Sequence, residues 1–224
     1  MRAAFRRLTA LVLCFLLVFD GIILVRVSAD AGGSPRDALT FDDGPHPGRT
    51  KRILGLLEKY SVKATFFILG CNAEYYPEPL KMAVAAGHEI EDHSFDHVTR
   101  GKSAGELKAG ILKTAEIIER VSGRAPRYFR PPEGQCTPAL DEALASLGYR
   151  TVFWTLDTRD WTGKPADAIA RDVLKTVKDG DILLFHDYTC PGDNTLHALE
   201  RIVPELLSRG YRFVTVEELL TKDK

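Results

Sequence analysis

The sequence predicts an α/β fold built on a parallel sheet. Along the 224 residues, short apolar runs typical of buried strands alternate six to seven times with amphipathic helical patterns. No tight turn motif joins two strand-like runs as it would in a β-hairpin. These two observations favour either an incomplete (β/α) barrel or a doubly wound sheet, and they leave both alternatives open.

In the first half of the chain, apolar runs predict strands and apolar positions spaced three to four residues apart predict helices. The longest helix begins after Ser103, which forms a capping box with Glu106, and it ends at Gly123. Strands are expected at 38–41, 62–69 and from 88 to 90, and further helices at 49–60 and 79–86.

The second half continues the same alternation. Thr137 and Pro138 predict a helix start, because proline is tolerated in the first turn, and Gly148 ends that helix. Pro204 is expected to kink the last long helix. Strands are expected at 128–130, 151–156, 182–185 and 211–216, and further helices at 166–177 and 194–208.

The N-terminus has the layout of a secretory signal. Arginines precede an apolar stretch at about 8–27, and small residues follow at a cleavage point. An uncleaved membrane anchor is the alternative, although Asp20 inside the stretch favours cleavage. We expect a signal peptide or anchor at 1–29, a linker at 30–36, and one catalytic domain at 37–221 that lies outside the cell or at its surface.

Composition limits the partners and the redox chemistry. The formal net charge is −1, and no basic run follows the N-terminus, so nothing indicates nucleic acid and no obligate protein partner is implied. Cys71, Cys136 and Cys190 leave an odd number of thiols in the exported part. A Cys136–Cys190 disulfide is a hypothesis, whereas zinc binding by cysteines is disfavoured because no C-x-x-C pair occurs.

Five short polar clusters stand out, most of them where an apolar run ends. Parallel α/β folds gather the carboxyl ends of their strands on one face and build their active sites there. Two histidines, several aspartates and an arginine on one such rim indicate a metal-dependent hydrolase. The clusters are Thr40–Pro45, His93–His97, Arg130–Gly134, Asp157–Trp161 and Leu184–Asp187.

The pair His93 and His97 becomes a metal site once a carboxylate joins it. Two imidazoles and one carboxylate leave coordination positions for water and substrate. Asp42 and Asp43 end the first expected strand, and adjacent residues on an extended segment point in opposite directions. One aspartate can therefore bind the metal while the other faces the substrate as a base, in a turn fixed by Gly44 and the following proline.

These clusters together resemble the polysaccharide deacetylase family with the NodB homology domain, carbohydrate esterase family 4. The resemblance runs from about Leu39 to Leu220, and the motifs occur in the order found in the family. It implies a distorted (β/α) barrel with about seven parallel strands. The motifs are Thr-Phe-Asp-Asp-Gly-Pro, His-Ser-x-x-His, Arg-Pro-Pro-x-Gly, Asp-x-x-Asp-Trp and Leu-x-His.

By this resemblance, the metal ligands are Asp43, His93 and His97. Asp42 is then the catalytic base, and Arg130 pairs with it and orients it. The resemblance implies a divalent ion, with zinc expected first. Iron, cobalt and nickel also suit two imidazoles and a carboxylate.

The resemblance also implies the other roles. His186 is the general acid, and Asp160 positions it. Trp161 and Leu184 line the pocket for the acetyl methyl group, and the backbone amide of Glu133 stabilises the oxyanion. Glu133 stands where an aromatic residue is frequent, which removes a stacking contact with sugar.

A second departure from the family pattern is Glu91-Asp92 before the first histidine. We interpret Asp92 as an acidic rim residue, with support of a metal ligand as the alternative. The implied function is N-deacetylation of N-acetylglucosamine-containing polysaccharide, with bacterial peptidoglycan first. The alternatives are chitooligosaccharide deacetylation, acetylxylan esterase activity, a catalytically silent carbohydrate-binding homologue, and hydrolysis of a small non-sugar amide.

Overall fold

The computed structural model describes residues 33–188 and 192–221. The expected signal peptide or anchor at 1–29 and the first residues of the linker lie outside the described residues. Within the described part, no helix has the length and apolarity needed to cross a membrane. Among the described residues, neither Cys71 nor Cys136 forms a disulfide. Cys190 lies outside the described residues, so its pairing with Cys136 stays a prediction.

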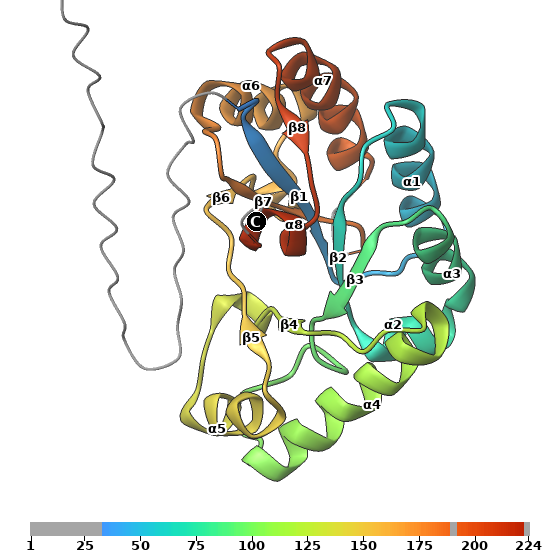
Figure 1. The fold of residues 1–224 in the computed structure, drawn as a ribbon, viewed down its shortest axis with the longest axis vertical. Helices are drawn as coiled ribbons and strands as arrows, with labels where there is room; N and C mark the ends of the chain where they lie inside the picture. Colours follow the sequence, from blue (N-terminus) through green and yellow to red (C-terminus); the bar gives the residue numbers. More distant parts are fainter. Residues whose placement is uncertain (1–32, 189–191, 222–224) are drawn as a thin grey trace, which may run out of the picture.

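The described residues form one curved sheet in which every strand pair is parallel (Figure 1). The order is β5-β4-β3-β2-β1-β7-β6, and β8 pairs with the amino end of β1. The strands are β1 (Arg36–Asp42), β2 (Thr65–Ile68), β3 (Glu89–Asp92), β4 (Tyr128–Phe129), β5 (Arg150–Thr151), β6 (Leu156–Asp157), β7 (Ile182–His186) and β8 (Arg212–Phe213).

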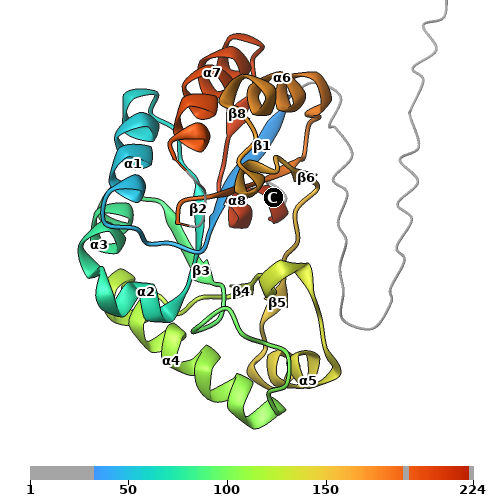
Figure 2. The same cartoon turned by 180° about the vertical axis from the view of Figure 1, so that it is seen from behind.

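Most helices pack around the outside of this sheet, which curls into a half-barrel when seen from either side, and the last short helix lies against its inner face (Figures 1 and 2). The predicted distorted (β/α) barrel is therefore confirmed, and the doubly wound alternative is wrong. The helices are α1 (Arg49–Lys59), α2 (Gly70–Tyr75), α3 (Pro77–Ala85), α4 (Ala104–Ser122), α5 (Pro138–Leu147), α6 (Ala166–Thr176), α7 (Asn194–Ser208) and α8 (Val216–Leu220), with 3₁₀ turns η1 (Pro132–Gly134) and η2 (Asp160–Thr162).

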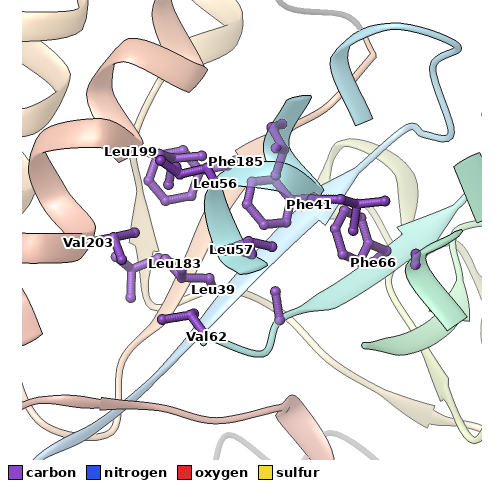
Figure 3. Packing of buried hydrophobic residues seen from close by; sticks show 14 of the residues in the cluster. Leu39, Phe41, Leu56, Leu57, Val62, Phe66, Leu183, Phe185, Leu199 and Val203 are labelled. Atoms are coloured by element: carbon purple, nitrogen blue, oxygen red, sulfur yellow. The ribbon is translucent and has the colours of Figure 1, made fainter. Parts of the chain in front are cut away.

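Side-chain alternation along the strands gives the sheet two apolar faces. Outward residues such as Phe41 and Phe185 pack against α1 and α7 in the main core (Figure 3). Inward residues such as Ala38 and Phe67 form a smaller core that α8 completes with Val216. Because both faces are buried, the strands appear in the sequence as continuous apolar runs. The alternation along each strand determines which residues at its end face inward.

Two expected strands are wrong in extent. The run 151–156 splits into β5 and β6, so Val152 and the three residues after it belong to neither strand. The run 211–216 is the short β8 followed by α8. Thr215 and Glu218 form a capping box that starts this helix, which overrides the β-branched pattern before it.

Two helical expectations also need correction. Helix α2 was not expected, because its sequence lacks an apolar period. In α4 the capping box of Ser103 and the left-handed Gly123 are confirmed. The apolar spacing of three to four residues also predicts Leu112 on the buried stripe of that helix, but Leu112 is 42% exposed and Ile117 lies in the core instead.

Candidate active site

The site lies at the carboxyl ends of the strands, as expected. Residues Ala38 and Ile182 face the inner core, so the residues that follow them at even spacing face inward as well. This alternation carries Asp42 and His186, which are register partners on β1 and β7, to the inner rim. Arg130, two residues after the inward Tyr128, arrives there from β4.

The structure brings together the three residues expected to bind metal. Ligand atoms of Asp43, His93 and His97 lie within 4.8 Å of one another. Asp43 Oδ1 is 3.5 Å from Nε2 of each histidine. One carboxylate and two imidazoles with converging atoms suit a borderline divalent ion such as zinc. The arrangement therefore fits the implied metal.

The backbone selects the tautomer of His93. Its Nδ1 lies 2.8 Å from the carbonyl oxygen of Arg130, which can only accept, so Nδ1 carries the proton. Nε2 then presents a lone pair toward Asp43. A hydrogen bond of this kind fixes the orientation of a ligating imidazole and raises its basicity.

Arg130 holds the expected base. Its guanidinium is fully buried and donates to Asp42 Oδ1 at 2.7 Å and to Thr40 Oγ1 at 2.8 Å. The guanidinium also stacks over the ring of Phe67, 4.0 Å from its centroid. Burial lowers the pKa of Arg130, and the Asp42 carboxylate opposes that shift. The pair thus forms a desolvated contact with little freedom to rotate.

Both carboxylates of the Asp42-Asp43 pair approach the same imidazole. Asp42 Oδ2 lies 3.7 Å from His93 Nε2, close to the 3.5 Å of Asp43 Oδ1. The expectation that the two side chains point in opposite directions is therefore wrong. Asp43 has a φ of 75°, so the chain leaves the extended conformation at this residue and turns its carboxylate back toward the site.

The pKa values of the two histidines shift in opposite directions. Burial lowers the pKa of His93, but the carboxylates of Asp42 and Asp43 outweigh it and raise the pKa above its usual range. The pKa of His97 is lowered by its burial and by His93. In this carboxylate-rich setting, protons compete with a metal mainly at His93.

His186 ends β7 beside Asp42, and a carboxylate holds its imidazole. Its Nδ1 lies 2.8 Å from Asp160 Oδ1, and its backbone N–H donates to Asp160 Oδ2 at 2.8 Å. The hydroxyl of Thr195 on α7 donates to the same Oδ2, and Asp160 is fully buried. Three donors fix Asp160, which in turn orients the imidazole of His186 as a proton donor needs.

The three residues expected at the substrate contribute differently. Leu184 faces inward on β7, two residues before His186, and is 3% exposed. Trp161 is 52% exposed in η2, directly after Asp160. Glu133 has an exposed side chain and a φ of 56°, which directs its carboxylate to solvent near Arg100. Their roles toward substrate stay predictions.

Asp92 is fully buried, so its interpretation as an acidic rim residue is wrong. Its Oδ1 accepts the backbone N–H of Ser94, and its Oδ2 accepts the hydroxyl of Tyr149. Burial raises the pKa of Asp92 to about 8. The carboxyl thus fixes the backbone directly after His93. Its place directly before the His-Ser-x-x-His cluster was the available signal, but an acidic residue beside a cleft is more often exposed.

Comparisons with known proteins agree with this geometry. A family model described as polysaccharide deacetylase matches residues 30–152. A peptidoglycan-N-acetylglucosamine deacetylase from Bacillus cereus is 40% identical over 186 residues, which cover 82% of this chain and 87% of the relative.

Solved structures share the fold. The peptidoglycan deacetylase PdaC from Bacillus subtilis has a TM-score of 0.77 at 35% identity, covering 85% of this chain and 92% of that one. A pseudoenzyme of carbohydrate esterase family 4 from Bacillus anthracis has a TM-score of 0.76 at 30% identity, covering 84% and 66%. Together with the sequence match, these likenesses establish that the chain belongs to the polysaccharide deacetylase family of hydrolases.

Proposed function

We propose that this protein removes acetyl groups from N-acetylglucosamine residues of bacterial peptidoglycan, with zinc as its metal, outside the cell or at its surface. The observation that carries the proposal is that two proton-transfer groups lie at the same rim of the sheet as one metal-binding cluster. Asp42, held by Arg130, and His186, held by Asp160, end the neighbouring strands β1 and β7. The cluster at this rim consists of Asp43, His93 and His97. The fold alone would not suffice, because a pseudoenzyme shares it.

The ligands Asp43, His93 and His97 would hold the ion. A bound divalent ion lowers the pKa of water toward about 7 and polarises a carbonyl. Asp42 accepts the proton of the attacking water, and Arg130 keeps that carboxylate oriented. His186 gives a proton to the departing amine as acetate leaves, and the backbone amide of Glu133 donates to the developing oxyanion.

The substrate proposal draws on the activity for which the Bacillus cereus relative is named and on the expected export of the chain. Peptidoglycan lies outside the cytoplasmic membrane, where the N-terminal pattern would deliver the domain. Trp161 and Leu184 are proposed to contact the acetyl methyl group. The exposed Trp161 follows Asp160, which holds His186, and the inward Leu184 lies two residues before His186.

The test is acetate release by the zinc-loaded full-length protein from peptidoglycan and from chitin oligomers in parallel. We expect release from peptidoglycan that chelation abolishes and added zinc restores. Release from chitin oligomers alone would assign the protein to chitin instead. Release only from a small non-sugar acetamide, or none at all despite bound zinc, would reject a polysaccharide substrate.

A further inference from the structure

Asp187 is a buried carboxylate that the proposed chemistry does not use. It follows His186 at the end of β7, and alternation turns it away from the inner rim toward the start of α1. Its side chain is completely buried, and Oδ2 accepts the hydroxyl of Thr50 at 2.5 Å. Oδ1 has no hydrogen-bond partner among the described residues. A buried carboxylate with only one such bond is costly and calls for a reason.

The Asp187 carboxylate packs against Gly44, in the turn that directly follows Asp42 and Asp43. A Cβ placed on Gly44 would lie 2.2 Å from Asp187 Oδ1 and 2.3 Å from Oδ2, which is a steric clash. The backbone N–H of Asp187 also donates to the carbonyl oxygen of Asp42 at 3.2 Å. Gly44 does not have a positive φ. Glycine is therefore required here by the contact with Asp187 and not by the backbone conformation.

Thr50 links this contact to the rest of the turn. While its hydroxyl donates to Asp187, it accepts the backbone N–H of His46 at 2.7 Å. From the other side, Asn72 donates to the carbonyl oxygen of Asp43 at 2.7 Å. The turn after β1 is thus held at both flanks, and Asp187 fills the space behind it.

We propose that Asp187 is a positioning residue for the metal site, acting with Thr50 through the turn at Gly44. By fixing this turn it keeps the Asp43 carboxylate directed at His93 and His97. Only the expected change in kcat depends on the proposed function. The expected change in zinc affinity does not depend on it.

The first experiment compares zinc affinity and kinetics of the full-length protein with those of Asp187→Asn and Thr50→Val. Loss of a group that supports metal ligands typically costs 10–100-fold. We expect the zinc dissociation constant to rise about 10-fold or more and kcat to fall, with KM unchanged because Asp187 does not touch substrate. Zinc affinity is read by competition with a chromophoric chelator, and the melting temperature of the metal-free protein is recorded for each variant.

Asp37→Asn is the matched control. Asp37 is equally buried, also has an oxygen without a hydrogen-bond partner among the described residues, and lies at the opposite end of β1. It should leave zinc affinity and kcat unchanged, whatever it does to the melting temperature. Equal losses of zinc affinity in Asp37→Asn and Asp187→Asn would show general destabilisation and overturn the proposal.

The second experiment tests the contact itself by a double-mutant cycle. Gly44→Ala should weaken zinc binding in the wild type, because the new methyl group meets the carboxylate. In an Asp187→Ala background the methyl group has room, so adding Gly44→Ala should cost little more. Strictly additive losses, or unchanged zinc affinity in Asp187→Asn, would overturn the proposal. Coupled losses in zinc affinity without acetate release from any glycan would reject the proposed function alone.

Discussion

Arg130 connects both halves of the site through different atoms. Its guanidinium donates to Asp42, and its carbonyl oxygen accepts from Nδ1 of His93. The side chain that orients the base therefore belongs to the residue that sets the tautomer of a metal ligand. Because one residue makes both contacts, Arg130 fixes the position of the base Asp42 relative to the metal ligand His93.

At the scale of single residues, His93 and His186 should separate metal binding from proton transfer. His93→Ala removes a ligand, so bound zinc should be lost together with activity. His186→Ala leaves Asp43, His93 and His97 in place, so zinc should be retained while kcat falls by about 10²–10⁴-fold, the usual contribution of a general acid. Metal content is measured by atomic emission after gel filtration, and kcat by acetate release.

Asn72→Ala serves as a control for the neighbourhood, because the side-chain amide of Asn72 donates to the backbone of Asp43 and not to its carboxylate. It should weaken zinc binding less than His93→Ala. Zinc retained by both histidine variants would contradict the assignment of the ligands, and zinc lost by both would contradict the assignment of His186.

At the scale of elements, the end of α4 nearest the His93–His97 loop depends on its cap. Ser103 Oγ accepts the N–H of Glu106, and the Glu106 carboxylate accepts the N–H of Ser103. Ser103→Ala should lower the free energy of unfolding by about 0.5–2 kcal/mol. Urea unfolding measures this, with Thr137→Ala, the cap of α5, as a comparison of similar size.

The kinetic constants should not change in Ser103→Ala, because the cap does not contact the metal or proton-transfer residues. A loss of kcat larger than threefold would show instead that the start of α4 positions His97 through the short loop between them.

The sequence was informative where an element has a local signal. Strand β1, the capping box at Ser103 and the polar clusters at strand ends were all foreseen, because periodicity and capping are local properties. The turn of Asp43 and the burial of Asp92 were not, since both depend on partners far along the chain. Helix α8 was missed for a related reason, because its apolar residues pack inside the barrel and mimic a strand.

At the scale of the whole molecule, several carboxyl groups are buried in the sheet. Asp37, at the amino end of β1, and Glu91, on the inner face of β3, are buried carboxyls at opposite ends of the sheet. Burial raises the pKa of each to about 8, and Glu89 adds to the shift of Glu91. Glu91 accepts two backbone N–H groups and faces Arg124, so it also holds the segment that leads into β4.

These groups predict how stability depends on pH. A carboxyl with a raised pKa keeps its proton in the folded state and loses it in the unfolded state, so its contribution is lost as pH rises from about 4 to about 8. Buried His88, with its pKa lowered by burial to about 4, acts in the opposite sense only below about 6.5. The free energy of unfolding should therefore fall between pH 6.5 and pH 8.

Urea unfolding of the metal-free protein across this pH window is the measurement. Asp37→Asn keeps the shape of the side chain but cannot titrate, so it should reduce the slope by up to about 1.4 kcal/mol per pH unit, the value for one proton. Glu133→Gln, an exposed carboxyl at the rim, should leave the slope as in the wild type. A wild-type protein more stable at pH 8 than at pH 6.5 would show that the buried carboxyls are ionised in the folded state, with Arg124 and the backbone amides outweighing their burial.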